Sequence, residues 1–239
     1  MKTVILCGGR GTRIRDVAEH IPKPMVPLGN RPILWHLMQY YAHWGNREFI
    51  LCLGYKGNVI RRYFATSHQE PSWTVTPADT GLNTMTGGRI KRIQKYVASD
   101  NNFMLTYGDG LGTIDLKRLL AFHLSHGKIL TVSGVRPPSR FGELQMNPKG
   151  LITAFNEKPQ VSQGRISGGF FVCRKEIFRY LNNRIDLVFE QEPIRRLVRD
   201  RQAIVYKHDG FWQPMDTYRD YLYLNGLLKK RKAPWVLWK

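Results

Sequence analysis

Short apolar runs bounded by turn residues recur along the first half of this chain and predict β-strands. The expected strands lie at 2–7, 48–53, 72–76, 102–107 and 129–135. Between them, apolar positions recur at the spacing of a helix face, most clearly in the segment that starts at Pro32 and stops at Gly45. Further helices are predicted at 57–65, 88–98 and 115–126. This alternation is typical of a mostly parallel sheet with helices on both faces.

The pattern after about residue 136 is more mixed. Strands are expected near 142–147, 151–157, 167–173 and 203–208, and helices near 175–182, 189–200 and 217–230. A chain of 239 residues suits one large domain with a sizeable core. The predicted class is therefore α/β: a Rossmann-like, mostly parallel or mixed sheet flanked by helices, in a single domain. Ligands of such sheets bind beyond the carboxyl ends of the strands.

The charge of the chain bears on its partners. Lys and Arg number 37 against 18 acidic residues, so the net charge is +19, a field that attracts polyanions. A nucleic-acid-binding protein is therefore the alternative of a different class. However, the basic residues are spread over many predicted helices, and neither zinc-finger spacing nor an RNA-recognition signature is present. Most are expected on solvated helix faces, and no nucleic acid is expected as a partner.

The three cysteines are widely spaced and lie in apolar segments. Cys7, Cys52 and Cys173 form no Cys-x-x-Cys pair, so buried, reduced thiols are predicted. No signal peptide is recognised and no apolar run is long enough to span a bilayer. These features favour a cytoplasmic protein without membrane association.

A glycine-rich turn follows the first predicted strand. Val4 to Cys7 is apolar, and the chain then runs into Gly8, Gly9 and Gly11, where backbone N–H groups can converge on an anion. Arg10 and Arg13 add fixed positive charge suited to phosphate. The turn lacks the third glycine of a dinucleotide fingerprint and the Gly-Lys-Ser/Thr ending of a P-loop. Polyphosphate binding is predicted here, and a tight turn with incidental arginines is the alternative.

Two further segments carry candidate chemistry. Lys23 lies between two prolines that hold it extended, so its ammonium can reach a triphosphate, unless it is an ordinary surface lysine. Asp109 lies between Gly108 and Gly110 at the end of a predicted strand, an open position for a hard cation such as Mg²⁺. An Asp-Gly turn is the alternative for this aspartate.

Motifs along nearly the whole chain resemble the sugar-1-phosphate nucleotidyltransferases. In the order of that family stand the glycine turn, Pro22-Lys23-Pro24-Met25, Arg31-Pro32-Ile33-Leu34-Trp35-His36, Gly54-Tyr55-Lys56-Gly57, Thr86-Gly87-Gly88-Arg89, Tyr107-Gly108-Asp109-Gly110, Arg140-Phe141-Gly142, Asn156-Glu157-Lys158-Pro159, Gly168-Gly169-Phe170-Phe171 and Gly210-Phe211-Trp212-Gln213-Pro214-Met215-Asp216-Thr217. The Met85–Arg89 and Phe211–Thr217 segments look most like the CTP-using branch, the glucose-1-phosphate cytidylyltransferases.

The resemblance implies a division of labour. About 1–135 would bind the nucleotide and about 136–239 the sugar, within one domain of 1–239. The implied catalytic residues are Arg13, Lys23, Asp109, Lys158 and Asp216, with Mg²⁺ on Asp109 and Asp216. The implied nucleotide-binding residues are Leu6, Cys7, Gly8, Gly9, Arg10, Gly11, Thr12, Arg13, Lys23, Thr84, Gly87, Gly88, Arg89 and Gly108. The implied sugar-binding residues are Gly142, Glu157, Lys158, Ser167, Gly168 and Gly169. For Asp216, the N-cap of the helix near Thr217 is the alternative.

Two departures from the family pattern stand out. Ser167 occupies a position where the cytidylyltransferases usually have Asn, which bears on the sugar. The segment from Ala65 to Asp79 is shorter than its counterpart, which in the family helps subunits to pack. A homo-oligomer is still expected.

The implied reaction is attack by a sugar-1-phosphate oxygen on the α-phosphorus of CTP, with loss of diphosphate. The nucleophile is already an anion, so positioning and charge neutralisation suffice for catalysis. His123 and His126 are predicted to be core or surface histidines. Use of another nucleotide or sugar phosphate is the enzymatic alternative, and a non-catalytic nucleotide- or nucleic-acid-binding relative is the other.

Overall fold

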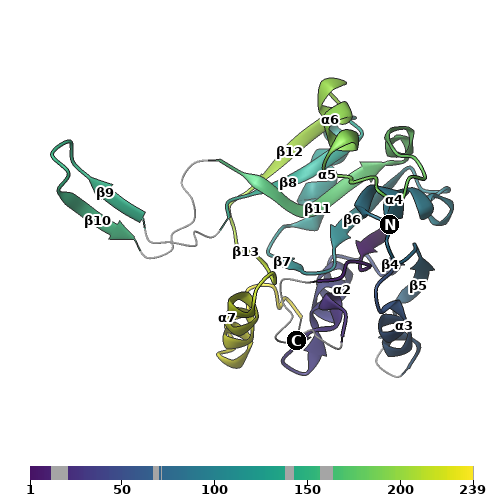
Figure 1. Cartoon of the computed structure of the whole chain (residues 1–239), viewed down its shortest axis with the longest axis horizontal. Helices are drawn as coiled ribbons and strands as arrows, with labels where there is room; N and C mark the ends of the chain where they lie inside the picture. The colour runs from purple at the N-terminus through teal and green to yellow at the C-terminus, as the bar shows by residue number, and fades with distance from the viewer. Residues whose placement is uncertain (12–20, 67–69, 71, 138–142, 157–163, 239) are drawn as a thin grey trace.

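A seven-stranded sheet runs through the described part of the chain (Figure 1). In this computed structural model the described residues are 1–11, 21–66, 70, 72–137, 143–156 and 164–238. The strands of the sheet, in spatial order, are β12 (Ala203–His208), β8 (Leu130–Val135), β11 (Ile166–Arg174), β6 (Asn102–Tyr107), β1 (Lys2–Leu6), β4 (Glu48–Leu53) and β5 (Thr74–Asp79).

The sheet is mixed, as the α/β class predicts. Neighbouring strands are parallel in the pairs β1–β4, β1–β6, β4–β5 and β8–β12, whereas β11 runs antiparallel between β6 and β8. β1 therefore occupies an inner position with parallel neighbours on both sides, and its apolar sequence fits that burial. The carboxyl ends of β1 and β6 lie side by side, since Leu6 pairs with Tyr107.

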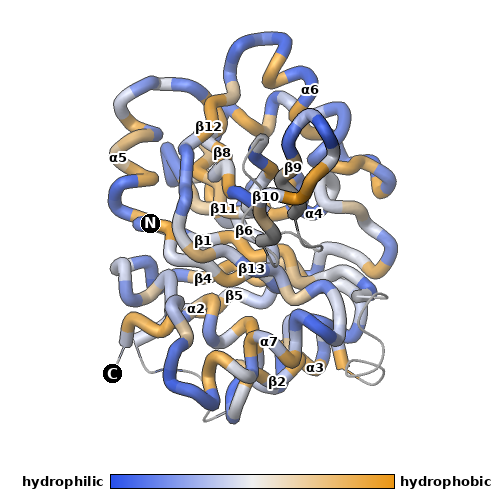
Figure 2. The backbone as a smooth tube through the Cα atoms, turned by 90° about the vertical axis from the view of Figure 1, so that its left-hand side faces the viewer, coloured by the Kyte–Doolittle hydropathy of each residue, from blue (hydrophilic) through white to orange (hydrophobic). Residues whose placement is uncertain are grey.

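Helices cover both faces of the sheet. Two hydrophobic cores result, because alternate residues of a strand point to opposite faces: Ile5 packs into one core, and Val4 and Leu6 into the other. Figure 2 shows this hydrophobic interior along the strands. The α-helices are α2 (Ile33–His43), α3 (Gly57–Ala65), α4 (Thr86–Arg92), α5 (Leu116–His126), α6 (Glu192–Arg199) and α7 (Tyr218–Lys229). The 3-10 helices are η2 (Lys23–Met25), η3 (Gln94–Tyr96) and η4 (Lys175–Tyr180).

Most predicted elements are present with shifted ends. The strand expected at 72–76 is Thr74–Asp79, and it tolerates Pro77 because β5 is an edge strand. The helix expected at 88–98 is Thr86–Arg92 followed by a separate 3-10 turn. The segment expected to be a helix near 175–182 is the 3-10 helix η4.

In the described part of the chain, three small sheets accompany the large one. They pair β2 (Pro27–Leu28) with β3 (Arg31–Pro32), β7 (Gly110–Gly112) with β13 (Trp212–Pro214), and β9 (Glu143–Met146) with β10 (Ile152–Asn156). The β9–β10 hairpin extends away from the main sheet (Figure 1). Among the described residues, no helix is long and apolar enough to cross a membrane.

Candidate functional site

A pocket of about 360 Å³ opens at the carboxyl ends of β1 and β6. Many of the predicted nucleotide-binding residues line it: Leu6, Cys7, Gly8, Gly9, Gly11, Lys23, Thr84, Arg89 and Gly108. Pro24, Met85, Thr86, Tyr107 and Asp109 complete the lining. Thr12 and Arg13 lie outside the described residues. We call this cavity the first pocket.

Gly8 lies directly above the buried side chain of Arg89. Arg89 donates hydrogen bonds to the carbonyl oxygens of Gly8 at 3.0 Å and Leu53 at 2.9 Å, and to Thr80 Oγ1 at 2.7 Å. A Cβ on Gly8 would lie 2.1 Å from Arg89 Nη1, so any larger residue there would displace the guanidinium. Burial lowers the pKa of Arg89, but these acceptors satisfy its guanidinium. Arg89 therefore holds the glycine turn in place, besides lining the pocket.

The other predicted residues around the first pocket make contacts within the protein. The N–H groups of Gly87 and Gly88 both donate to the carbonyl oxygen of Leu187, at 2.9 and 3.2 Å. Thr84 is buried, and its hydroxyl accepts a hydrogen bond from Arg92 at 2.8 Å. These amide groups are thus occupied by a protein acceptor.

Arg10 lies on the exposed side of the glycine turn. Its guanidinium donates to Asn83 Oδ1 at 3.1 Å and lies 5.9 Å from the centre of the Tyr55 ring. The side chain therefore joins the glycine turn to the segment that precedes α4.

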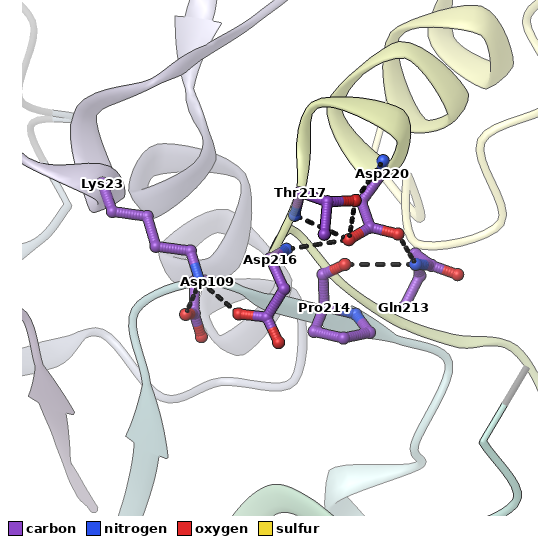
Figure 3. Close-up of polar contacts among 7 residues, drawn as sticks. All are labelled: Lys23, Asp109, Gln213, Pro214, Asp216, Thr217 and Asp220. Atoms are coloured by element: carbon purple, nitrogen blue, oxygen red, sulfur yellow. Dashed lines mark hydrogen bonds and ion pairs between the residues drawn. The ribbon is translucent and has the colours of Figure 1, made fainter. Parts of the chain in front are cut away.

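Lys23, Asp109 and Asp216 converge where the two candidate substrate cavities meet: Lys23 and Asp109 line the first pocket, and Asp216 lies beside them (Figure 3). The ammonium of Lys23 lies 2.6 Å from Asp109 Oδ2 and 2.6 Å from Asp216 Oδ1. Burial by itself would lower the pKa of Lys23, but the charge and hydrogen bonds of the two aspartates raise it. Lys23 is therefore a buried, protonated cation between two carboxylates, and the reading of it as an ordinary surface lysine is wrong.

The pairing of β7 with β13 brings Asp216 to Asp109. Pro214 pairs with Gly110, and the N–H of Met215 donates to the Asp109 carbonyl oxygen at 2.9 Å. The next residue, Thr217, is the N-cap of α7, with Asp220 completing a capping box, so the N-cap alternative for Asp216 is wrong. Asp216 stands just before the helix, and its N–H donates to Asp220 Oδ2 at 3.0 Å.

A second pocket, of about 250 Å³, adjoins the first. The predicted sugar-binding residues Ser167, Gly168 and Gly169 line it, together with both aspartates. The remaining lining residues are Thr106, Tyr107, Gly110, Trp212 and Pro214. Tyr107 and Asp109 therefore line both pockets. Gly142, Glu157 and Lys158 lie outside the described residues.

Sequence reasoning did not select Tyr107 and Trp212 as site residues. The indole N–H of Trp212 donates to the Gly168 carbonyl oxygen at 2.7 Å and so joins β13 to β11 across the second pocket. Both aromatic residues stand in the quoted motifs, Tyr107 two residues before Asp109 and Trp212 four residues before Asp216. An aromatic residue in the same motif as a candidate carboxylate was the available signal.

The donor set at the two aspartates suits a hard cation. Both carboxylates are partly exposed, at 27% for Asp109 and 21% for Asp216, and they face the same ammonium. Mg²⁺ commonly takes one or two carboxylates and completes its shell with phosphate oxygens and water. Within the described ranges no group of three or more His, Cys, Asp and Glu is placed to hold a metal.

The three cysteines, His123 and His126 have other protein groups as their neighbours. Cys7, Cys52 and Cys173 are free and buried, as predicted, and burial raises their pKa values. His123 is also buried, and its Nδ1 lies 2.7 Å from Thr131 Oγ1. His126 Nε2 contacts the same hydroxyl at 2.9 Å.

Comparison with known proteins extends over the whole fold. The glucose-1-phosphate cytidylyltransferase of Salmonella typhimurium is 44% identical over 260 residues, with all of both chains covered. A probable glucose-1-phosphate cytidylyltransferase of Bacillus subtilis is 40% identical, again with both chains fully covered. The crystal structure of HddC from Yersinia pseudotuberculosis complexed with GMP-PN has a TM-score of 0.72 at 25% identity and covers 95% of this chain and 99% of that one. The sequence profile of the nucleotidyl transferase family matches residues 2–230, and the chain is therefore a member of that family.

Proposed function

We propose that this chain transfers the cytidylyl group of CTP to α-D-glucose 1-phosphate, giving CDP-glucose and diphosphate. The observation that carries the proposal is the pair of adjoining pockets with Asp109 in their common wall. A nucleotide in the first pocket and a sugar phosphate in the second would meet at that aspartate. The full-length identity to glucose-1-phosphate cytidylyltransferases supports the choice of CTP and glucose.

In this proposal the two substrates bind mainly to different parts of the chain. The lining of the first pocket comes from residues up to Asp109, whereas Ser167–Gly169 and Trp212–Asp216 contribute to the second. The division into a nucleotide-binding part near 1–135 and a sugar-binding part near 136–239 remains part of the proposal, as do the assigned roles of Arg13, Glu157 and Lys158.

The reaction forms a bond from the sugar-phosphate oxygen to the α-phosphorus and breaks the bond from that phosphorus to the bridging oxygen. The glycine turn would orient the triphosphate through its N–H groups, and Lys23 would supply positive charge beside it. Because the attacking oxygen is already ionised, these residues need to position it and lower the repulsion between two anions.

Mg²⁺ is proposed as the cofactor, held by Asp109 and Asp216. When bound, it would neutralise phosphate charge and stabilise the leaving diphosphate. The ammonium of Lys23 contacts one oxygen of each carboxylate, so Lys23 and the cation would be held by the same two side chains.

The decisive experiment measures diphosphate release with Mg²⁺ and glucose 1-phosphate. CTP, ATP, UTP, dTTP and GTP are tested in parallel, and Asp109→Asn is compared with Asp186→Asn, an exposed aspartate paired with Arg184. Release with CTP, lost in Asp109→Asn and kept in Asp186→Asn, supports the proposal. A preference for GTP would assign GTP instead of CTP as the nucleotide substrate. No release of diphosphate with any nucleotide would contradict the proposed reaction.

The sugar is tested separately at Ser167. This exposed residue lines the second pocket, where a hydroxyl replaces the amide expected from the family. We expect Ser167→Asn to lower the KM for glucose 1-phosphate without changing the KM for the nucleotide. Faster turnover of the wild type with mannose 1-phosphate or galactose 1-phosphate would assign a different sugar.

A homo-oligomer is also part of the proposal. The β9–β10 hairpin extends from the main sheet and exposes Met146, Leu151 and Ile152, at 66%, 67% and 56%. Exposed apolar residues close together are typical of contact surfaces between proteins. Analytical ultracentrifugation should find a mass above 27.8 kDa. A purely monomeric species at micromolar concentration would contradict this part.

A further inference from the structure

Glu190 accepts hydrogen bonds from two residues of the first pocket, although it lies outside the motifs. One carboxylate oxygen, Oε2, accepts from the hydroxyl of Thr86 at 2.7 Å, and the other accepts from the hydroxyl of Tyr107. Thr86 Oγ1 in turn accepts from the N–H of Phe189 at 2.9 Å. Each hydroxyl proton thus has a definite acceptor, and the carboxylate links the first residue of α4 to the end of β6.

Aromatic packing closes this network on its other side. The Tyr107 ring makes an edge contact with Phe171, with centroids 5.8 Å apart, and Phe171 makes a similar contact with Phe189. Phe189 is fully buried and precedes Glu190 in the chain. The side chains of Phe189 and Glu190 therefore support Tyr107 at two points, its ring through Phe171 and its hydroxyl through the Glu190 carboxylate.

The Tyr107 ring also has little room on the side of β11. Gly169 has φ +76°, and a Cβ there would lie 2.5 Å from Tyr107 Cδ2. The Tyr107 ring is thus held against β11, which contributes to the lining of the second pocket. The ring itself lines both pockets.

We propose that Glu190 is a positioning residue that holds Tyr107 as the common wall of the two pockets and so keeps the two substrates in register. Glu190 acts through Tyr107 and Thr86 and need not touch either substrate. This inference rests on the proposed function only in assuming that both pockets are filled during the reaction.

The expected effect falls on kcat rather than on KM. Each substrate keeps the rest of its pocket when the wall loosens, so its KM should change less than threefold. Alignment of the two reacting atoms matters in the transition state, and small misplacements there are costly. We therefore expect Glu190→Ala and Tyr107→Phe each to lower kcat by about tenfold or more. Glu190→Gln keeps one acceptor oxygen and should lose less than Glu190→Ala.

The test is a double-mutant cycle between Glu190→Ala and Tyr107→Phe. If both act through one hydrogen bond, the double variant should be no slower than the slower single variant. The control is Glu192→Gln, two residues along the chain. The Glu192 carboxylate is exposed, and its ion pair with Arg196 is long, at 3.8 Å. The control should turn over like the wild type.

Several outcomes would overturn the inference. They are unchanged kcat in both single variants, effects that multiply independently, a rise in one KM with kcat preserved, or equal loss in the Glu192→Gln control. The melting temperature of each variant is measured alongside, since a merely structural role would lower it without this pattern. Failure of the proposed function is a different result: wild-type protein inactive with CTP and glucose 1-phosphate. The cycle is then run with whichever nucleotide and sugar phosphate the wild type does convert. A wild type that converts none overturns both proposals.

Discussion

Two buried cations lie beside the first pocket, and their partners differ. Arg89 donates hydrogen bonds to two main-chain carbonyl oxygens, of Gly8 and Leu53, and to the hydroxyl of Thr80. Lys23 is bound by two carboxylates that also line the second pocket. A cation held by neutral main-chain acceptors builds the site, whereas one held by two anions can exchange them for substrate phosphate. We therefore expect the positive charge of Arg89 to serve structure and that of Lys23 to serve the proposed reaction.

Among the tests of this comparison, removing the charge of Lys23 has the largest expected effect on turnover. Lys23→Ala leaves Asp109 and Asp216 facing each other without their cation, and the triphosphate loses an adjacent positive charge. We expect turnover to fall by about 10²–10³-fold. The free energy of unfolding should fall by about 2–3 kcal/mol, at the lower end for a buried pair because both carboxylates are partly exposed.

Magnesium provides the check on Lys23→Ala. Added Mg²⁺ should raise the melting temperature of this variant more than that of the wild type, because the cation can take the place of the missing ammonium. Calorimetry at several Mg²⁺ concentrations measures the effect. Equal shifts in both proteins would argue against a metal at Asp109 and Asp216.

Replacing Arg89 should damage stability before chemistry. Arg89→Met fills much of the same volume but leaves several buried acceptors unsatisfied, so we expect a loss of about 2–4 kcal/mol in unfolding free energy. Well below its melting temperature, the variant should keep a kcat within about tenfold of the wild type. Urea denaturation and steady-state kinetics on the same preparation separate the two effects. A kcat reduced as far as in Lys23→Ala would remove the distinction between the two cations.

Adding one methyl group tests the same contact from the side of the loop. Gly8→Ala places a Cβ against the pinned guanidinium and should cost about 2 kcal/mol, since Arg89 must leave its acceptors. Gly9→Ala is the matched control, because no atom lies within 4 Å of its Cβ. Combining Gly8→Ala with Arg89→Met should cost less than the sum of the two. Strict additivity would show that the clash does not act through Arg89.

The smallest expected effect on stability comes from replacing His123, a third buried basic side chain. It is buried without a carboxylate partner in the contacts described, and burial, with the charges of His126 and Arg174, lowers its pKa from 6.5 to about 4. The unfolded chain therefore binds a proton first as pH falls, and stability is lost between about pH 6.5 and pH 4. His123→Gln should flatten this part of the stability profile, measured by urea denaturation at several pH values. An unchanged slope would place the titration elsewhere.

The sequence predicts well those elements that are long and periodic. β4 and β6 coincide with the apolar runs that predicted them. α5 begins after its N-cap Asp115 and ends at Gly127, which has the left-handed backbone conformation. Strands of two or three residues, such as β7 and β13, carry no periodic signal, although they bring Asp216 to Asp109. Convergence of those aspartates therefore had to come from family resemblance.

The role of Arg89 could not be obtained from its sequence neighbours. In a short run with Lys91 and Arg92 it has the pattern of a solvated helix face, and only the tertiary structure encloses it between the glycine turn and β5. Glu190 is similar, since its partners Thr86 and Tyr107 belong to distant segments. Sequence patterns report burial that repeats along an element and miss single contacts across the fold.

The place of β11 in the sheet has a consequence for biosynthesis. β5, β4, β1 and β6 are contiguous and parallel, and every residue lining the first pocket has been synthesised once Asp109 has been added. β6 and β8 must then wait with facing open edges until β11 emerges to fill the gap between them. Such unpaired edges are exposed to misassociation while translation continues. The nascent chain thus contains every lining residue of the first pocket long before those of the second, which are complete only after Asp216 has been added.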